Sequence, residues 1–319
     1  ELHCQDALDV LMDAYEEEDK LFVKEAYVQA LSMIDCSEYL PQLEVRLQEL
    51  VAYDAPEEEK KHVQAEIRAL QELLLQKKGV KKHTFNGWNR SSEVLLLTIP
   101  AFRDALAEEV TGKKKVLKSG VRTIVPDFET VMKIRTIQEL LFVIHTQTEG
   151  NVLSADPETL AAQLAESDLM QILAETHKGD VPFCFRIGVS GAMSLEERSI
   201  FSKRVAAAIE GAFERNLINS TSHYEVELRL LQHREGGFVP LLKLYTLPDH
   251  RFDYRRYYVA ASMKPMMAAG LMALAKPYLK EYAQILDPFC GVGTLLMERR
   301  FAVPARNAYG IDTFGEAIE

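Results

Sequence analysis

The chain has 319 residues, of which 47% are hydrophobic and 27% are charged. This composition is typical of a soluble globular protein, and no apolar run approaches the roughly 18 residues of a membrane-spanning helix, which excludes the membrane-embedded class. The opening ELHCQDALDV lacks the basic and apolar regions of a signal peptide, so a cytoplasmic location is expected. The four cysteines form no CxxC or CxxH pair, so reduced thiols and no metal site are predicted.

Acidic residues are concentrated near the start of the chain. Residues 1–75 hold 19 Asp and Glu against 6 Lys and Arg, whereas the remainder holds 29 acids and 31 bases. The net charge of -11 therefore belongs to one segment. An acidic module joined to a slightly basic remainder is compatible with an RNA-binding part and a separate protein-interaction part.

Residues 1–78 are predicted to be helical, because apolar residues recur at helical spacing and the first glycine is Gly79. A helix over 57–76 would begin after Pro56 with acidic residues in its first turn, as the helix dipole favours. The first two predicted helices resemble one HEAT-like unit, although three repeats are not evident. We predict a helical module that can dock a protein partner, followed by a linker over 77–92.

Strands and helices alternate from residue 93 onwards, which predicts two small α+β domains. The first has strands at 94–99, 116–126 and 140–144 and helices at 101–110 and 128–136. The second has helices across 157–177, a strand at 183–191, an amphipathic helix at 194–216 and a hairpin formed by 224–234 and 238–247. The glycines Gly236 and Gly237 mark the turn of that hairpin.

Residues 284–318 have the pattern of a strand (QILD), a loop (PFCGVG), a helix (TLLMERRF) and a second strand (AYGID). This is the opening β-α-β unit of a doubly wound sheet, in which ligands bind at the carboxyl ends of the strands. Gly291 and Gly293 would let the backbone approach such a ligand closely. Leu296 stands where the GxGxxG fingerprint needs a third glycine or alanine, which disfavours a nicotinamide dinucleotide.

Two acidic residues are predicted to lie beside this loop. Asp312, at the end of the second strand, suits hydrogen bonds from ribose hydroxyls. Asp287, at the end of the first strand, suits a cationic group such as a sulfonium or an ammonium. Together they favour an adenosyl cofactor with a positive centre.

The octapeptide DPFCGVGT, followed by YGID, resembles motif I and the ribose-binding acid of S-adenosylmethionine-dependent methyltransferases, whose motif is typically DPFCGSGT. Val292 departs from that pattern, because serine is usual there. The resemblance implies S-adenosylmethionine as the cofactor, bound by Asp287, Pro288, Phe289, Cys290, Gly291, Gly293, Thr294 and Asp312. We expect Cys290 to be an inert part of the loop, since no basic neighbour would activate its thiol.

The upstream run RFDYRRYYVAASMKPMMAAGLMALA resembles the segment that joins the RNA-binding half to the catalytic domain in THUMP-containing RNA methyltransferases. That resemblance adds Ser262 and Lys264 to the cofactor residues. Residues 93–147 look like the ferredoxin-like domain that precedes THUMP in this family. The predicted fold class is multidomain α and α+β: a helical, HEAT-like module with its linker over 1–90, a ferredoxin-like domain over 91–150, a THUMP-like α/β domain over 151–250, and the first part of a Rossmann-like methyltransferase domain over 251–319.

The resemblance implies an RNA methyltransferase that transfers a methyl group from S-adenosylmethionine to a base amino group of structured ribosomal or transfer RNA. RNA contacts are predicted at basic residues, although the lysines would also suit a solvated loop and the arginines an interdomain linker: Lys113, Lys114, Lys115, Arg251, Arg255 and Arg256. Histidines such as His83 and His145 show no ligand or triad spacing and receive no role.

The catalytic motif of the family, an Asn or Asp followed by Pro-Pro and an aromatic residue, is expected beyond Glu319. The catalytic residues are therefore unknown, and the chain alone is expected to be inactive. One alternative is a nonenzymatic RNA-binding or scaffold protein with a vestigial cofactor loop. Another is a DNA amino-methyltransferase, which would leave residues 91–250 unexplained.

Overall fold

The structure is a computed structural model, and it describes residues 7–78, 83–88, 91–256, 259–260 and 262–318. Cys4 lies outside the described residues. The chain divides into two compact units. Unit 1 comprises Glu1–His83, Gly179–Arg186 and Arg215–Glu225, and unit 2 comprises Thr84–Lys178, Ile187–Glu214 and Val226–Glu319.

The first part of unit 1 is helical, as the sequence predicts. Its elements are α1 (Leu8–Glu17), α2 (Leu21–Ser32), the 3-10 turn η2 (Ser37–Tyr39), α3 (Leu40–Ala52) and α4 (Glu57–Lys78). The helix α4 begins directly after Pro56 with three glutamates in its first turn. The apolar residues at helical spacing form one core, in which Leu31, Leu43 and Leu70 are fully buried. The HEAT-like assignment stays a prediction.

A buried charge cluster ties these helices together. The Glu66 side chain on α4 is completely buried. It accepts a hydrogen bond of 2.6 Å from the Tyr15 hydroxyl on α1 and two from the Arg46 guanidinium on α3, at 3.0 and 3.3 Å. Burial and the Glu66 carboxylate raise the pKa of Tyr15 above its usual value. Since a buried carboxylate is tolerated only when it is paired, these helices depend on one another's side chains.

Unit 1 also contains the start of β7 (Phe183–Ser190) and all of β8 (Leu217–Asn219). The two strands pair in parallel, with Phe183 opposite Leu217. The His83 ring stacks on Phe183 with ring centroids 3.6 Å apart, and His83 Nδ1 lies 2.9 Å from Glu225 Oε2. Residues 77–92 were predicted to be a linker, but His83 is buried in this contact. Unit 1 therefore includes residues that lie more than 100 positions apart in the sequence.

Unit 2 is built on an antiparallel arrangement of strands in the order β3-β4-β2-β5-β10-β9, with β7 next to β9. The strands are β2 (Ser92–Leu97), β3 (Lys114–Leu117), β4 (Gly120–Val125), β5 (Glu139–Val143), β9 (Val226–Gln232) and β10 (Phe238–Leu244). Gly236 and Gly237 have φ values of 96° and 75° at the turn between β9 and β10. This confirms the predicted hairpin, whose register places Phe238 opposite Gln232.

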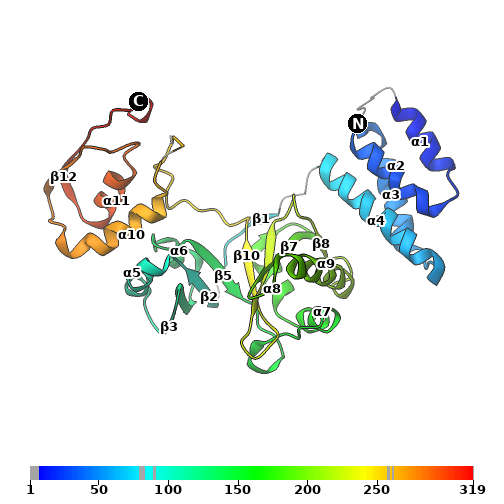
Figure 1. Cartoon of the computed structure of the whole chain (residues 1–319), viewed down its shortest axis with the longest axis horizontal. Coiled ribbons are helices and arrows are strands. Elements are labelled where there is room, and N and C mark those ends of the chain that lie inside the picture. Colours follow the sequence, from blue (N-terminus) through cyan, green and yellow to red (C-terminus); the bar gives the residue numbers. More distant parts are fainter. Residues whose placement is uncertain (1–6, 79–82, 89–90, 257–258, 261, 319) are drawn as a thin grey trace. The chain divides into compact units, whose positions relative to one another are not determined.

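The helices of this part of unit 2 follow the predicted positions. They are η3 (Pro100–Phe102), α5 (Arg103–Glu109), α6 (Phe128–Met132), the 3-10 turn η4 (Glu149–Asn151), α7 (Pro157–Ala165), α8 (Leu169–Thr176) and α9 (Leu195–Ala212). Ser194 and Glu197 form a reciprocal capping box at the start of α9, which explains why the helix begins there. The helices α7 and α9 pack side by side (Figure 1).

The segment predicted to be a linker also contributes a strand to unit 2. The strand β1 (Thr84–Phe85) pairs with β6 (His177–Lys178), and Trp88 is only 4% exposed. The Trp88 ring contacts Phe128 and Phe142. The linker prediction was wrong for residues 83–88, because these aromatic side chains are buried by residues that lie far away in the sequence.

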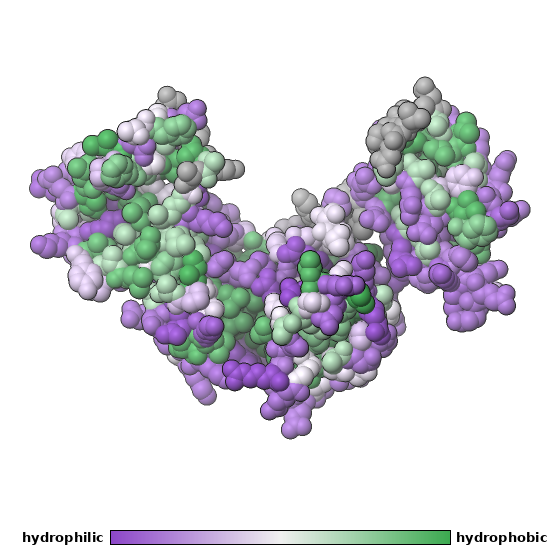
Figure 2. All heavy atoms as spheres, in the orientation of Figure 1, coloured by the Kyte–Doolittle hydropathy of each residue, from purple (hydrophilic) through white to green (hydrophobic). Residues whose placement is uncertain are grey.

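The last part of unit 2 contains α10 (Pro265–Ala275), the 3-10 turn η5 (Lys276–Tyr278), β11 (Ala283–Asp287), α11 (Thr294–Ala302), β12 (Ala305–Gly310) and the 3-10 turn η6 (Gly315–Ala317). The strands β11 and β12 are parallel, and α10 packs on α11. Apolar side chains reach the surface over this part of the chain (Figure 2). Leu286, Tyr309 and Ile311 are each more than half exposed, as expected for a small sheet with an uncovered face.

No helix in the described residues is both long enough and apolar enough to cross a membrane.

A charged network on the sheet of unit 2 predicts a specific acid sensitivity. The Glu139 carboxylate lies 2.6 Å from both the Arg229 guanidinium and the Lys243 ammonium. Burial raises the Glu139 pKa, but the hydrogen bonds from Arg229 and Lys243 outweigh it and lower the pKa to about 2. A lowered carboxyl pKa stabilises the folded state above the unfolded pKa of about 4.3, and this stabilisation is lost as the pH falls towards 2.

We therefore expect Glu139→Gln to lower the free energy of unfolding of unit 2 by about 3 kcal/mol at pH 7, and by much less at pH 2.5. Urea unfolding monitored by the fluorescence of Trp88, the single tryptophan of the chain, measures both values. The matched control is Glu129→Gln, at an exposed position on α6. If Glu139→Gln lowered the free energy of unfolding equally at pH 7 and pH 2.5, the ionised Glu139 carboxylate would not stabilise unit 2 through this network.

Candidate cofactor site

The predicted β-α-β unit is confirmed, and its loop has the backbone that the two glycines suggest. The strand β11 ends at Asp287, and α11 begins at Thr294. Gly291 and Gly293 have φ values of 50° and 73°, in the left-handed region. A Cβ atom at either position would meet no atom within 4 Å, so the glycines serve the backbone conformation and leave open space above the loop.

Asp312 holds this loop in place. Its Oδ2 atom accepts a hydrogen bond of 2.7 Å from the Gly291 N–H, and its Oδ1 atom accepts one of 2.9 Å from the Phe314 N–H. These backbone N–H groups lower the pKa of the Asp312 carboxyl below its usual range. The carboxylate is therefore charged at neutral pH and lies against the glycine loop at the carboxyl end of β12.

Asp287 lies at the carboxyl end of the neighbouring strand. Its Oδ1 atom accepts a hydrogen bond of 3.0 Å from the Phe289 N–H. Main-chain bonds join the two strand ends, since the Ile311 N–H donates to Asp287 O at 2.9 Å and the Cys290 N–H donates to Ile311 O at 3.0 Å. Two carboxylates thus flank one loop, where open α/β sheets bind their ligands.

The loop contains a thiol and a hydroxyl with different environments. Burial and the Asp287 and Asp312 carboxylates raise the pKa of the Cys290 thiol, which disfavours the reactive thiolate. The Thr294 hydroxyl is buried and has no hydrogen-bond partner among the described residues. A buried hydroxyl without a partner is costly, so its position at the start of α11 suits a polar ligand.

The structure separates the predicted cofactor residues into two groups. The loop residues and Asp312 lie together, with Pro288 and Phe289 exposed on the loop. The Ser262 hydroxyl instead accepts a hydrogen bond of 2.8 Å from the Val259 N–H, and Lys264 is exposed immediately before α10. A role for Ser262 and Lys264 at the cofactor stays a prediction.

The predicted RNA-binding lysines lie at the start of β3, and all three are exposed. Lys114 differs from its neighbours, because its ammonium donates to the carbonyl oxygens of Ala107 and Val110 at the end of α5. Lys113 and Lys115 are therefore the better candidates for phosphate contacts.

The predicted RNA-binding arginines are not equivalent either. The Arg251 side chain is 7% exposed, pairs with Asp249 at 2.8 Å, and donates to the carbonyl oxygens of Ile134 and Ile137. The structure corrects the prediction that Arg251 contacts RNA, because its guanidinium is buried and binds the backbone of residues 134 and 137. Arg256 is exposed, and Arg255 is partly buried.

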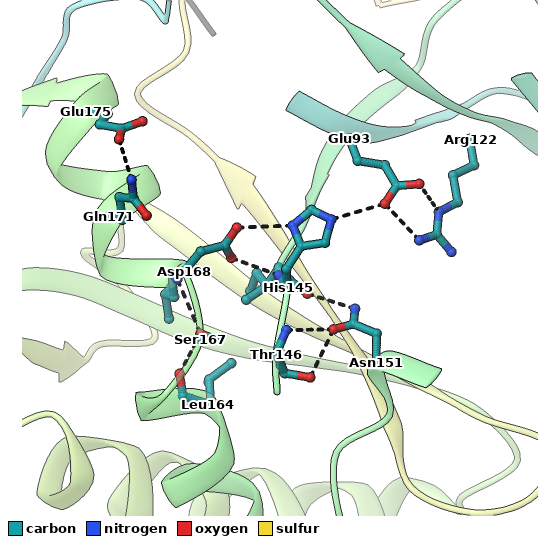
Figure 3. Close-up of polar contacts among 12 residues, drawn as sticks. Glu93, Arg122, His145, Thr146, Asn151, Leu164, Ser167, Asp168, Gln171 and Glu175 are labelled. Carbon is teal, nitrogen blue, oxygen red and sulfur yellow. Dashed lines mark hydrogen bonds and ion pairs between the residues drawn. The ribbon is translucent and has the colours of Figure 1, made fainter. Parts of the chain in front are cut away.

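Two clusters of charged side chains were missed by the sequence reasoning. In the first cluster, His145 Nδ1 lies 3.1 Å from a carboxylate oxygen of Asp168, and His145 Nε2 lies 3.1 Å from one of Glu93 (Figure 3). Arg122 pairs with the same Glu93. Both ring nitrogens can donate only in the imidazolium form. The sequence carried no signal for this cluster, because its members are 23 and 52 residues from His145.

The second missed cluster joins Arg135 and Tyr254 to Glu298 on α11. Glu298 is four positions after Thr294, on the helix that follows the glycine loop. The only local signal was a glutamate in an otherwise apolar and basic helix.

Residues 253–312 match the family model of the RMKL-like methyltransferase domain. These residues carry a methyltransferase-domain signature. The match extends from Asp253, near the start of the upstream segment, to Asp312, and it supports the resemblance drawn from DPFCGVGT. We call residues 253–312 the methyltransferase segment. No curated protein matches the chain.

Several solved structures are similar to the chain. SMU.472, solved in complex with SAH, has a TM-score of 0.48 at 16% identity, over 67% of this chain and 56% of its own. A "predicted N6-adenine-specific DNA methylase" from Listeria monocytogenes has a TM-score of 0.45 at 16% identity, over 66% and 54%. A 4-thiouridine synthetase in complex with RNA and ATP has a TM-score of 0.32 at 17% identity, over 48% and 42%. The chain spans a little over half the length of the first two structures.

Proposed function

We propose that this chain is part of an S-adenosylmethionine-dependent RNA methyltransferase that modifies a base amino group in ribosomal or transfer RNA. The observation that carries the proposal is the Asp312 carboxylate, 2.7 Å from the Gly291 N–H, in a segment that matches a methyltransferase domain. The RNA substrate and the target amino group rest on the resemblance of residues 93–275 to THUMP-containing RNA methyltransferases.

The residues of the loop fit such a cofactor. Asp312 would accept hydrogen bonds from the ribose hydroxyls, and Asp287 would lie near the positive charge of the cofactor. Gly291 and Gly293 leave open space at the loop, and Thr294 offers a buried hydroxyl that has no partner in the described residues. When bound, the cofactor supplies an activated methyl group on its sulfonium. The chain's own residues would hold and orient it, and methyl transfer to an amine depends mostly on such positioning.

The test is methyl transfer by the full-length protein. Tritiated methyl label from S-adenosylmethionine should enter ribosomal or transfer RNA prepared from cells that lack the gene, and nucleoside analysis of the RNA would identify the methylated base. The Asp312→Ala variant should lose most of this activity, whereas the exposed Glu316→Ala should keep it. Label in DNA in place of RNA would support a DNA amino-methyltransferase. Absence of S-adenosylhomocysteine binding by the full-length protein would favour a nonenzymatic scaffold.

The exposed lysines Lys113, directly before β3, and Lys115, on β3, give the RNA proposal its own prediction. Each phosphate contact that is lost reduces the salt dependence of RNA affinity by about 0.7 to 0.9 in the log–log slope. We expect Lys113→Ala/Lys115→Ala to lower that slope by about 1 to 2 in RNA titrations between 50 and 200 mM salt. The control is Lys133→Ala/Lys276→Ala, at exposed positions elsewhere in unit 2. An unchanged slope for the β3 variant would exclude these lysines as phosphate contacts.

A further inference from the structure

A buried ion pair connects α11, the helix that follows the glycine loop, to an upstream part of unit 2. Arg135, in the turn between α6 and β5, donates two hydrogen bonds to the Glu298 carboxylate, at 2.8 and 2.7 Å. The Tyr254 hydroxyl donates a third, of 2.6 Å, to Glu298 Oε1. Both oxygens of the carboxylate are thereby used by side chains that precede Glu298 by more than 40 residues.

The surroundings make this pair rigid. The Glu298 side chain is 1% exposed, and the Arg135 side chain is 23% exposed. The Arg135 guanidinium lies over the rings of Phe301 and Phe252, at 4.2 and 4.9 Å from their centroids. Burial and the Glu298 carboxylate raise the pKa of Tyr254, so its hydroxyl stays a donor. A planar guanidinium held by a bidentate carboxylate and by two rings has one favoured orientation.

The pair contacts α11 one turn beyond its first residue. Residues four apart on a helix lie on the same face, and both Thr294 and Glu298 are buried. Thr294 directly follows Gly293 of the loop. A displacement of Glu298 would therefore move the start of α11, and with it the loop that Asp312 also holds.

Other contacts lie at the same junction. The Arg251 guanidinium donates to the carbonyl oxygens of Ile134 and Ile137, which flank Arg135 in the sequence. The helix α10, which packs on α11, also packs on η3 and α5. These contacts hold the segment near Arg135, whereas the Glu298 carboxylate itself is bound by the Arg135 guanidinium and the Tyr254 hydroxyl.

We propose that Arg135 is a positioning residue for methyl transfer: through Glu298 it sets the orientation of α11 and the cofactor loop relative to the upstream part of unit 2, which contains β2 and β5 and would contribute to RNA binding. The inference rests on the proposed function for its catalytic consequence, but the structural coupling can be measured without activity. Arg135 would act through Glu298 and would touch neither the cofactor nor the RNA.

The experiment compares full-length wild-type protein with Arg135→Gln, Arg135→Lys and Arg135→Gln/Glu298→Gln. We expect Arg135→Gln to lower kcat at least 10-fold while the Kd values for S-adenosylhomocysteine and for RNA stay within 3-fold. Arg135→Lys should recover part of kcat, because lysine keeps the charge but not the two parallel hydrogen bonds. The double variant should lose no more than Arg135→Gln alone, since the two residues act together.

A control variant and a substitute variant complete the experiment. Arg204→Gln, which removes an exposed pair with Glu158 at 3.4 Å, is the control and should leave kcat unchanged. If Arg135→Gln does not fold, Tyr254→Phe removes one hydrogen bond to Glu298 and should give a smaller loss of kcat with both Kd values unchanged.

The structural coupling has a readout besides activity. Amide hydrogen exchange of residues 294–302 should be faster in Arg135→Gln than in wild type, while exchange in β2 and β5 stays the same. If the wild-type protein transfers no methyl group but Arg135→Gln still exchanges faster than wild type in residues 294–302, the proposed function is overturned and the structural coupling is kept. An unchanged kcat in Arg135→Gln, or unchanged exchange in α11, would overturn the role of Arg135.

Discussion

Replacing Asp312 by alanine is expected to weaken binding of S-adenosylhomocysteine to the full-length protein about 100-fold. Hydrogen bonds to a charged group contribute about 1.5 to 3 kcal/mol each, and the variant would lose those from the ribose hydroxyls. It would also release the Gly291 N–H, which donates to Asp312 at 2.7 Å. Isothermal titration calorimetry of the variant and the wild type measures the difference.

Two further variants separate the two roles of Asp312. Asp312→Asn keeps one side-chain oxygen that can accept from Gly291 but lacks the charge, so its affinity should fall between those of wild type and Asp312→Ala. Glu316→Ala changes an exposed acid in η6 and should bind as wild type does. Equal affinity of Asp312→Ala and wild type would exclude Asp312 as the ribose-binding residue.

The largest loss of stability in unit 1 is expected from Glu66→Ala. The change leaves the Arg46 guanidinium and the Tyr15 hydroxyl without their shared acceptor in the interior of the helical module. Removing one partner of a fully buried ion pair costs about 3 to 5 kcal/mol. Because the Arg46 side chain is 31% exposed, water can solvate part of its charge, and we expect a loss near the lower end, about 3 kcal/mol. Urea unfolding followed by far-ultraviolet circular dichroism would detect the loss in the helical transition.

Arg46 provides its own matched control. Glu49 lies 3.9 Å from the same guanidinium, but its side chain is 62% exposed. Exposed pairs contribute at most about 1 kcal/mol, and i,i+3 pairs of this kind usually less than about 0.5 kcal/mol. Glu49→Ala should therefore leave unfolding nearly unchanged. A loss for Glu66→Ala as small as that for Glu49→Ala would show that the buried cluster contributes little net stability.

Local elements were predictable because their causes lie within a few residues. The start of α4 follows from Pro56 and the glutamates after it, and the start of α9 follows from Ser194 and Glu197. The β9–β10 hairpin follows from the two glycines at its turn. In each case the turn, the cap or the helix dipole acts over one or two turns of chain, so the sequence alone contains the decisive information.

Elements that depend on distant partners were not predictable. The strand β1 and the burial of Trp88 require β6 and the rings of Phe128 and Phe142. His83 is buried because its ring stacks on Phe183 and its backbone N–H donates to Glu225, 142 residues away in the sequence. A short segment with glycine, lysine and asparagine therefore has the composition of a linker although His83 and Trp88 within it are buried.

The same division applies to the site. The sequence by itself determined the order of strand, glycine loop, helix and strand, and it placed Asp287 and Asp312 at the two strand ends, because parallel strands in a β-α-β unit have their carboxyl ends at one edge. Only the tertiary structure decided that Asp312 binds the Gly291 N–H, that Arg251 is buried, and that Arg135 reaches Glu298 on α11. Such contacts depend on how separate elements pack and on which side chains they bury. The periodicity or residue spacing within one segment does not determine this packing.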